Sequence, residues 1–262
     1  MCPDNRHVAA STQGSGEPQL TPVVLAEREA LPLLRSAQVI GGQRMHYGSN
    51  YTFFVGLDAG NGRYLRAVYK PQAGERPLHD FPRGTLYKRE YATFLVSREL
   101  GWPDVPLTLV REGPHGVGAF QLFIEADPQM TYFELAERHA DTFRKFAVFD
   151  VLVNNADRKG GHCLLGKDGR IWSIDHGLTF HEQFKVRSVM LEFWGAEIPQ
   201  PLLDDLARLK PCLQGGGKLA ALLGELLTGD EVEALVGRLD YLLESKTHPV
   251  LDPASDVPWP LV

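Results

Sequence analysis

The first half of the chain alternates between strand-like and helix-like patterns of apolar residues. Within residues 39–70, two runs rich in aromatic and β-branched residues, YTFFVGL and RYLRAVYK, flank the turn-forming pair Asn61-Gly62, which predicts a β-hairpin. Over residues 86–100 the apolar positions recur at helical spacing, and Gly101 predicts the end of that helix. GAFQLFIE, at residues 118–125, returns to strand composition. This half of the chain is therefore predicted to be β-rich with one long helix.

The second half is mostly helical by the same criterion. Helical spacing extends over residues 133–153, and after a polar loop the run CLLGKDGRIWSID predicts a short hairpin that turns at Asp168-Gly169. Three further helices are predicted, the clearest over residues 230–244, where leucines and valines form one stripe. We therefore expect a two-lobed α+β fold, with a β-rich N-lobe over residues 21–125 and a mostly helical C-lobe over residues 126–248.

The two ends of the chain have a different composition. Residues 1–20 are small and polar, so they cannot bury enough apolar surface to offset the entropy of ordering and are expected to form a flexible tail. Residues 249–262 contain four prolines and are expected to form an extended terminal strap.

Composition and charge narrow the classes of function. The chain has 262 residues, of which 44% are apolar and 23% are charged, an ordinary balance for a globular protein. Its net charge of −6 gives no long-range attraction to nucleic acid or anionic lipid. The basic residues Arg83, Lys88 and Arg89 are expected to lie on a solvated surface, and the alternative is that they steer an anionic substrate. Three cysteines far apart in the sequence favour a reducing compartment, and no apolar run reaches the roughly 18 residues of a membrane helix. We therefore expect a cytoplasmic protein without nucleic-acid binding or stable membrane association.

The strongest candidate for chemistry is the polar loop NNADRKGGH at residues 154–162. Its Asp157 precedes the predicted hairpin and Asp175 follows it, so the returning chain can bring both carboxylates to one small volume. Phosphoryl transfer needs such a pair, because one carboxylate orients the attacking hydroxyl and another holds the divalent metal ion. The alternative is that these residues only cap turns around the hairpin.

Two upstream charges favour the first interpretation. Lys70 ends an apolar predicted strand, and Glu90 lies within the following helix, on or near its apolar side. Partly buried charges of opposite sign are costly unless they meet, and a Lys–Glu pair of this kind positions nucleotide phosphates in kinases. The alternative is two ordinary surface charges. Before them, the glycine of HYGSN can let backbone N–H groups approach phosphate oxygens closely.

These segments resemble a known family. The chain is similar to the phosphatidylinositol 3-/4-kinase superfamily, and most closely to its type II phosphatidylinositol 4-kinase branch, over about residues 40–200. The matching segments are AVYKP, the pair Arg89-Glu90, GAFQLFIE, FDVLVNNADRKGGH and SIDHGLTF. The run VYKPQAGERPLHDFPRGTLYKRE is in addition similar to an actinobacterial family related to these kinases.

The resemblance implies a protein-kinase-like fold that binds ATP and Mg²⁺ or Mn²⁺ between its lobes. It assigns catalysis to Asp157, with Arg158 supporting the loop, and to Lys70, which would contact the α and β phosphates. The implied nucleotide-binding residues are Gly48, Ser49 and Asn50 over the phosphates, Glu90 as the brace of Lys70, Ile174 under the adenine, and the backbone of Gln121, Leu122, Phe123 and Ile124 as the hinge. The implied metal ligands are Asp175 and, where the kinase pattern usually has asparagine, His162.

The resemblance also implies ATP-dependent transfer of the γ-phosphate to a hydroxyl group. The acidic net charge and the lack of a basic amphipathic helix argue against a membrane phosphoinositide as acceptor, so we expect a soluble metabolite or a protein Ser/Thr. Imidazole suits Mn²⁺ or Zn²⁺ better than Mg²⁺. His162 therefore keeps a second hypothesis open: a catalytically weak pseudokinase that acts as a nucleotide-binding sensor or scaffold.

Overall fold

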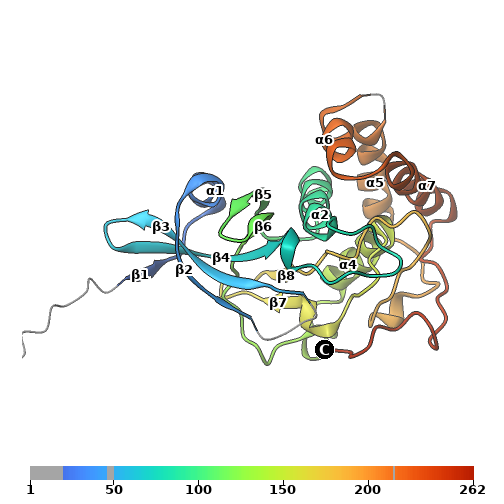
Figure 1. Cartoon of the computed structure of the whole chain (residues 1–262). Coiled ribbons are helices and arrows are strands. Elements are labelled where there is room, and N and C mark those ends of the chain that lie inside the picture. The colour runs from blue at the N-terminus through green and yellow to red at the C-terminus, as the bar shows by residue number, and fades with distance from the viewer. Residues whose placement is uncertain (1–19, 46–49, 215) are drawn as a thin grey trace, which may run out of the picture.

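The computed structural model describes residues 20–45, 50–214 and 216–262. The N-lobe is a twisted sheet in the order β2-β3-β4-β6-β5, with β1 added in parallel to β4. Helix α1 lies against one side of this sheet, and α2 packs against its strands β5 and β6 (Figure 1). The strands are β1 (Thr21–Val23), β2 (Val39–Arg44), β3 (Phe53–Gly60), β4 (Arg63–Pro71), β5 (Thr108–Gly113) and β6 (Gly116–Leu122), and the helices are α1 (Glu27–Ser36) and α2 (Leu86–Leu100).

The predicted central hairpin is confirmed. Strands β3 and β4 pair antiparallel, and Asn61 and Gly62 adopt positive φ angles of 54° and 67° between them. Two successive residues in the left-handed region form the turn that matches the twist of a hairpin, and asparagine followed by glycine accepts it at the least steric cost. The turn fixes the register, and the register places Lys70 near the end of β4.

Helix α2 has the predicted bounds, and Gly101 ends it in the left-handed conformation with a φ of 86°. Of its 15 residues, 10 are buried. This two-sided burial arises because α2 packs on β5 and β6 with one side and on α5 and α6 with the other. Helix α2 thus belongs to both lobes.

The C-lobe differs from the prediction in its first helix. The expected helix over residues 133–153 is divided into α3 (Tyr132–Leu135) and α4 (Ala140–Val153). Thr131 and Glu134 form a capping box at the start of α3. The break between α3 and α4 lets the rings of Tyr132 and Phe143 pack edge to face in a local core, with 5.0 Å between their centroids. The predicted hairpin and three final helices are confirmed as β7 (Cys163–Leu165), β8 (Ile171–Ser173), α5 (Gln200–Leu213), α6 (Lys218–Leu226) and α7 (Gly229–Ser245).

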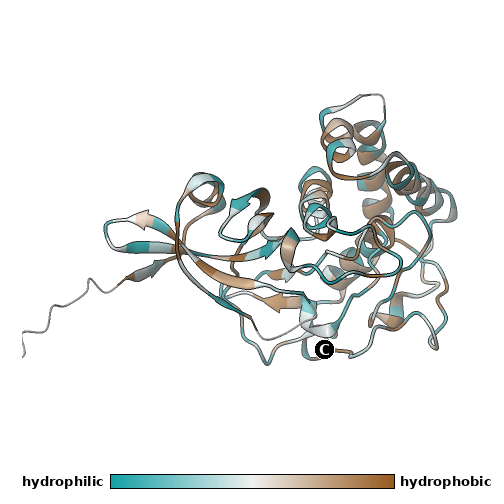
Figure 2. Cartoon of the chain, in the orientation of Figure 1, coloured by the Kyte–Doolittle hydropathy of each residue, from teal (hydrophilic) through white to brown (hydrophobic). Residues whose placement is uncertain are grey.

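One large apolar core joins the two lobes. It contains side chains of the sheet, of α2, of α4 and of the three final helices, and Figure 2 shows apolar residues where these elements face each other. None of the helices formed by the described residues combines the length and the apolar character that a bilayer crossing requires.

The Pro-rich strap returns along the C-lobe to the polar loop. The backbone N–H of Ser188 donates to the carbonyl of Asp256 at 3.0 Å, and that of Gly160 donates to the carbonyl of Leu261 at 2.8 Å. The chain therefore ends beside the loop that follows α4 (Figure 1). Residues 1–19 of the predicted tail lie outside the described residues.

Candidate active site

Lys70 joins two carboxylates that come from different parts of the chain. Its Nζ donates to Glu90 Oε1 of α2 and, at 3.0 Å, to Asp175 Oδ1 after β8. Burial alone would lower the pKa of Lys70, but the charges of Asp175 and Glu90 outweigh it and hold that pKa above its ordinary value. Lys70 likewise holds the pKa of Asp175 below its ordinary value. The expectation that Lys70 and Glu90 meet is confirmed.

The backbone at Asp175 is strained. Its φ of 60° lies in the left-handed region, which non-glycine residues seldom adopt. Such strain persists where the surroundings over-determine the conformation, and it is concentrated at functional sites. The next residue, His176, is fully buried and lies within hydrogen-bond distance of Ser173 Oγ and of an Arg158 nitrogen, so the segment is fixed on both sides of Asp175.

Asp157 is presented by a loop that folds back on the end of α4. Asn154 ends the helix with a φ of 56°, and Asn155 Oδ1 accepts the N–H of Asp157 at 3.0 Å. The carboxylate of Asp157 is partly buried, and burial raises its pKa. Lys159 Nζ lies 3.1 Å from Asp157 Oδ2. The sequence analysis does not assign Lys159 to the site, although its position in the polar loop, two residues after Asp157, indicates that its ammonium can reach that carboxylate.

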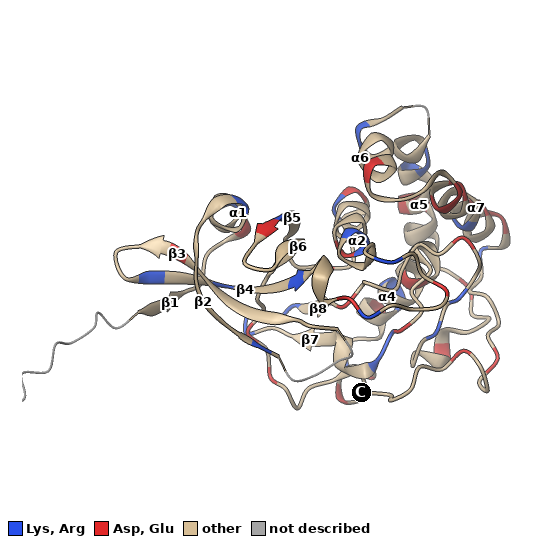
Figure 3. Cartoon of the chain, viewed as in Figure 1, with Lys and Arg blue, Asp and Glu red and all other residues tan. Residues whose placement is uncertain are grey.

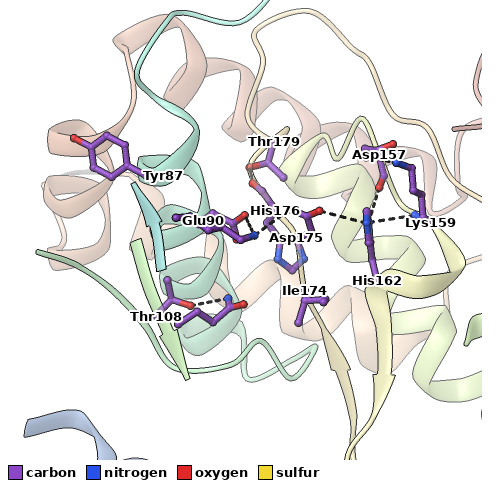
Figure 4. A network of polar contacts seen from close by, with 12 residues as sticks. Tyr87, Glu90, Thr108, Asp157, Lys159, His162, Ile174, Asp175, His176 and Thr179 are labelled. Carbon is purple, nitrogen blue, oxygen red and sulfur yellow. Dashed lines mark hydrogen bonds and ion pairs between the residues drawn. The ribbon is translucent and has the colours of Figure 1, made fainter. Parts of the chain in front are cut away.

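His162 directs one ring nitrogen at Asp175 (Figure 4). Its Nδ1 donates to the carbonyl oxygen of Asp157 at 2.8 Å, so in the neutral ring the other nitrogen, Nε2, carries a lone pair. Nε2 lies 3.3 Å from Asp175 Oδ2. Burial lowers the pKa of His162, which favours the neutral ring. Two lone pairs that face each other suit a shared divalent cation. Since the described residues contain no cluster of three or more metal-ligating side chains, further ligands would have to come from phosphate or water.

These groups line one cavity of about 330 Å³ between the lobes. Eight of the residues expected from the sequence lie in its wall: Asn50, Lys70, Glu90, Gln121, Asp157, His162, Ile174 and Asp175. Lys159 also lines it. Gly48 and Ser49 lie outside the described residues.

Part of this chain is similar to a family of known proteins. A model of the family Phosphatidylinositol 3- and 4-kinase matches residues 104–208, which include both carboxylates of the hairpin. Protein Rv2133c of Mycobacterium tuberculosis is 38% identical, over 83% of this chain and 90% of that protein. The chain belongs to the same family as that protein, within the phosphatidylinositol 3-/4-kinase-like superfamily.

Two more distant comparisons show a weaker likeness of sequence and a likeness of fold. Phosphatidylinositol 4-kinase gamma 4 of Arabidopsis thaliana is 25% identical over 62% of this chain, which spans about a third (34%) of the plant protein. The structure of the Golgi casein kinase with Mn/ADP bound superposes with a TM-score of 0.55 at 15% identity, covering 86% of this chain and 80% of that one. That likeness confirms the two-lobed kinase-like fold.

In this member of the superfamily Arg158 lies beneath the cavity and does not line it. Its guanidinium is fully buried and forms a bidentate pair with Asp150 of α4 at 2.7 and 2.9 Å. It also donates to Ser173 Oγ at 2.7 Å and to the carbonyls of His162 and Ile174. Arg158 thus ties the loop of Asp157 to the segment of Asp175, which is the supporting role that the resemblance implies.

Two backbone N–H groups of the predicted hinge already have partners. The N–H groups of Leu122 and Phe123 already donate to the carbonyls of Leu107 and Arg66, at 2.8 and 3.2 Å. With Ile124, these two residues line a separate cavity of about 200 Å³ next to β1 and the β7–β8 hairpin. Of the predicted hinge, Gln121 faces the main cavity, where its amide donates to Thr108 Oγ1 at 2.9 Å. Ile124 lies in the wall of the separate cavity and does not line the main one.

Proposed function

We propose that this protein is an ATP-dependent phosphotransferase that transfers the γ-phosphate to a hydroxyl of a soluble metabolite or a protein Ser/Thr. The observation that carries the proposal is the joint placement of Lys70, Asp157 and Asp175 in the wall of one cavity. A fixed ammonium, a metal-type carboxylate and a second carboxylate are the three groups that phosphoryl transfer requires.

The distances support a division of roles among these residues. Lys70 binds the nucleotide phosphates, held in place by Glu90. The acceptor oxygen attacks the γ-phosphorus, the bond to the bridging oxygen of ADP breaks, and the hydroxyl proton passes to the Asp157 carboxylate. Asp175 and His162 would hold a divalent cation, which neutralises phosphate charge when it is bound. Lys159, beside Asp157, adds a positive charge on the acceptor side.

A pseudokinase is the second candidate, because His162 stands where an asparagine would offer an oxygen ligand. In that case the protein binds nucleotide without transferring phosphate. Incubation with γ-labelled ATP and Mg²⁺ or Mn²⁺ separates the two: release of ADP or self-labelling supports the enzyme, and binding without either supports the sensor.

Nucleotide is expected to stabilise the protein through Lys70. At about 100 times its dissociation constant, ATP with a divalent cation adds roughly 2.7 kcal/mol to the free energy of unfolding. Thermal unfolding with and without the ligand measures this shift. Lys70→Met should remove most of it while the unliganded protein stays folded. The matched control is Lys210→Met, because Lys210 pairs with Asp240 between α5 and α7 and lines neither cavity. A Lys70→Met protein with the full shift would refute the phosphate role.

The metal preference is expected to depend on His162. His162→Asn replaces a nitrogen ligand with an amide oxygen, so activity should shift from Mn²⁺ toward Mg²⁺, the harder ion. Initial rates over a range of concentrations of each metal measure the preference. The control is His79→Asn, since the side chain of His79 is 95% exposed. An unchanged ratio of Mn²⁺ to Mg²⁺ activity in His162→Asn would show that His162 is not a ligand.

A further inference from the structure

Two charged side chains outside the cavity form a buried link between α2 and α7. Arg89 precedes Glu90 in the sequence, is 1% exposed, and donates to Oε1 of Glu231, which is 6% exposed. Its other terminal nitrogen, Nη1, donates to the carbonyl of Thr179. The expectation that Arg89 lies on a solvated surface is therefore wrong: its guanidinium leaves water to reach partners from the C-lobe.

Glu231 is itself held by the start of α7. Its Oε2 accepts the N–H of Thr228 at 2.9 Å, and Thr228 Oγ1 accepts the N–H of Glu231 at 3.3 Å. This reciprocal cap fixes the carboxylate at the first turn of a 17-residue helix. Arg89 is thus tied to a rigid element of the C-lobe.

The same link reaches the segment after Asp175. Thr179 Oγ1 lies 3.2 Å from Thr93 Oγ1 of α2 and donates to the carbonyl of His176 at 2.8 Å. Figure 4 shows Thr179, His176 and Asp175 close to Glu90. The contacts of Arg89 and Thr93 therefore connect α2 to the same short segment that supplies the second partner of Lys70.

Energy alone does not account for this pair. Desolvation of two charges usually costs as much as their attraction returns, and apolar residues of similar volume hold helices together equally well. A hydrogen-bonded ion pair adds geometric specificity, because a guanidinium with two fixed acceptors restricts the position and the rotation of the helix that carries it. The residue after Arg89 on α2 is Glu90, and the rotation of α2 decides whether its carboxylate points at Lys70.

We propose that Arg89 and Glu231 are positioning residues that hold α2 so that Glu90 stays on Lys70. The helices at the end of the C-lobe then act as a built-in clamp on α2, and neither a partner protein nor a modification is needed to bring Glu90 to the lysine. The inference rests on the proposed function for its nucleotide readout. Figure 3 shows basic residues on α2 and acidic residues on α7.

The test removes the ion pair without leaving a buried charge. In the double variant Arg89→Met with Glu231→Gln, neither end is charged and a glutamine can still cap the N–H of Thr228, so the melting temperature of the unliganded protein should change by only a few degrees. The dissociation constant of Mg²⁺·ATP is expected to rise about tenfold or more, and hydrogen exchange of the α2 amides to become faster. The matched control on the same helix is Arg98→Ala, which breaks the exposed pair of Arg98 with Glu27 and should alter neither quantity.

Each outcome decides the question. A folded double variant with wild-type affinity and wild-type exchange in α2 overturns the positioning role. If the double variant does not fold, Arg89→Lys, which keeps the charge and loses the second acceptor, is measured in the same way. If the unmodified protein binds no Mg²⁺·ATP, the proposed function fails, and hydrogen exchange in α2 still tests the clamp without nucleotide.

Discussion

Asp157→Asn is expected to lower the rate of phosphate transfer by about 10²–10⁴-fold, the usual contribution of a catalytic acid or base. The dissociation constant of Mg²⁺·ATP should remain nearly unchanged, because Asp157 contacts Lys159 and lies away from the Lys70–Glu90 pair. An interaction made only in the transition state affects the rate and not the binding of substrate. The rate of ADP formation and a separate ATP titration measure the two quantities.

The contrast with Asp175 sharpens this test. Asp175→Asn should weaken Mg²⁺·ATP binding as well as the rate, because Asp175 partners both Lys70 and His162. The control is Asp141→Asn at the start of α4, where the side chain is 97% exposed, which should leave both quantities unchanged. If Asp157→Asn retains more than about a tenth of the wild-type rate, Asp157 is not the catalytic base.

Arg158→Met is expected to destabilise the fold by about 3–5 kcal/mol. The change leaves the carboxylate of Asp150 charged and buried without its bidentate partner, and it removes the bond to Ser173 that links the two functional segments. Urea unfolding of the unliganded protein measures the loss.

Two further variants identify the cause of that loss. The double variant Arg158→Met with Asp150→Leu removes both charges and should recover most of the lost free energy of unfolding. Arg208→Met breaks an ion pair with Asp205 in which the arginine is 71% exposed, and should cost less than about 1 kcal/mol. A loss below about 1 kcal/mol for Arg158→Met would mean that Asp150 finds another partner.

The parts of the site that the sequence predicted correctly are those set by local rules. The turn at Asn61-Gly62 fixes the β3–β4 register and with it Lys70, and the periodicity of α2 together with Gly101 fixes the bounds of that helix. The β7–β8 hairpin brings Asp157 and Asp175 to one cavity, as the return of the chain required.

The parts that could not be predicted depend on tertiary partners. The sequence pattern predicts neither α1, which contains Pro32, nor β5, which follows α2. The engaged N–H groups of the hinge depend on Leu107 and Arg66, which lie far away in the sequence. Arg89 has the sequence neighbourhood of a surface residue, and only the position of α7 explains why it is buried.

The course of the strap has a practical consequence for how this protein is prepared. Gly160 has no room for a side chain, because an added Cβ would lie 2.7 Å from the ring of Phe133 and 3.4 Å from the carbonyl oxygen of Leu261. A Cβ added to Gly161 would lie 3.4 Å from a methyl carbon of Val262. An affinity tag fused after Val262 would therefore begin in contact with the loop that carries Asp157 and Lys159. A tag fused before β1, which lies at the left edge of the N-lobe in Figure 1, would not begin at this loop.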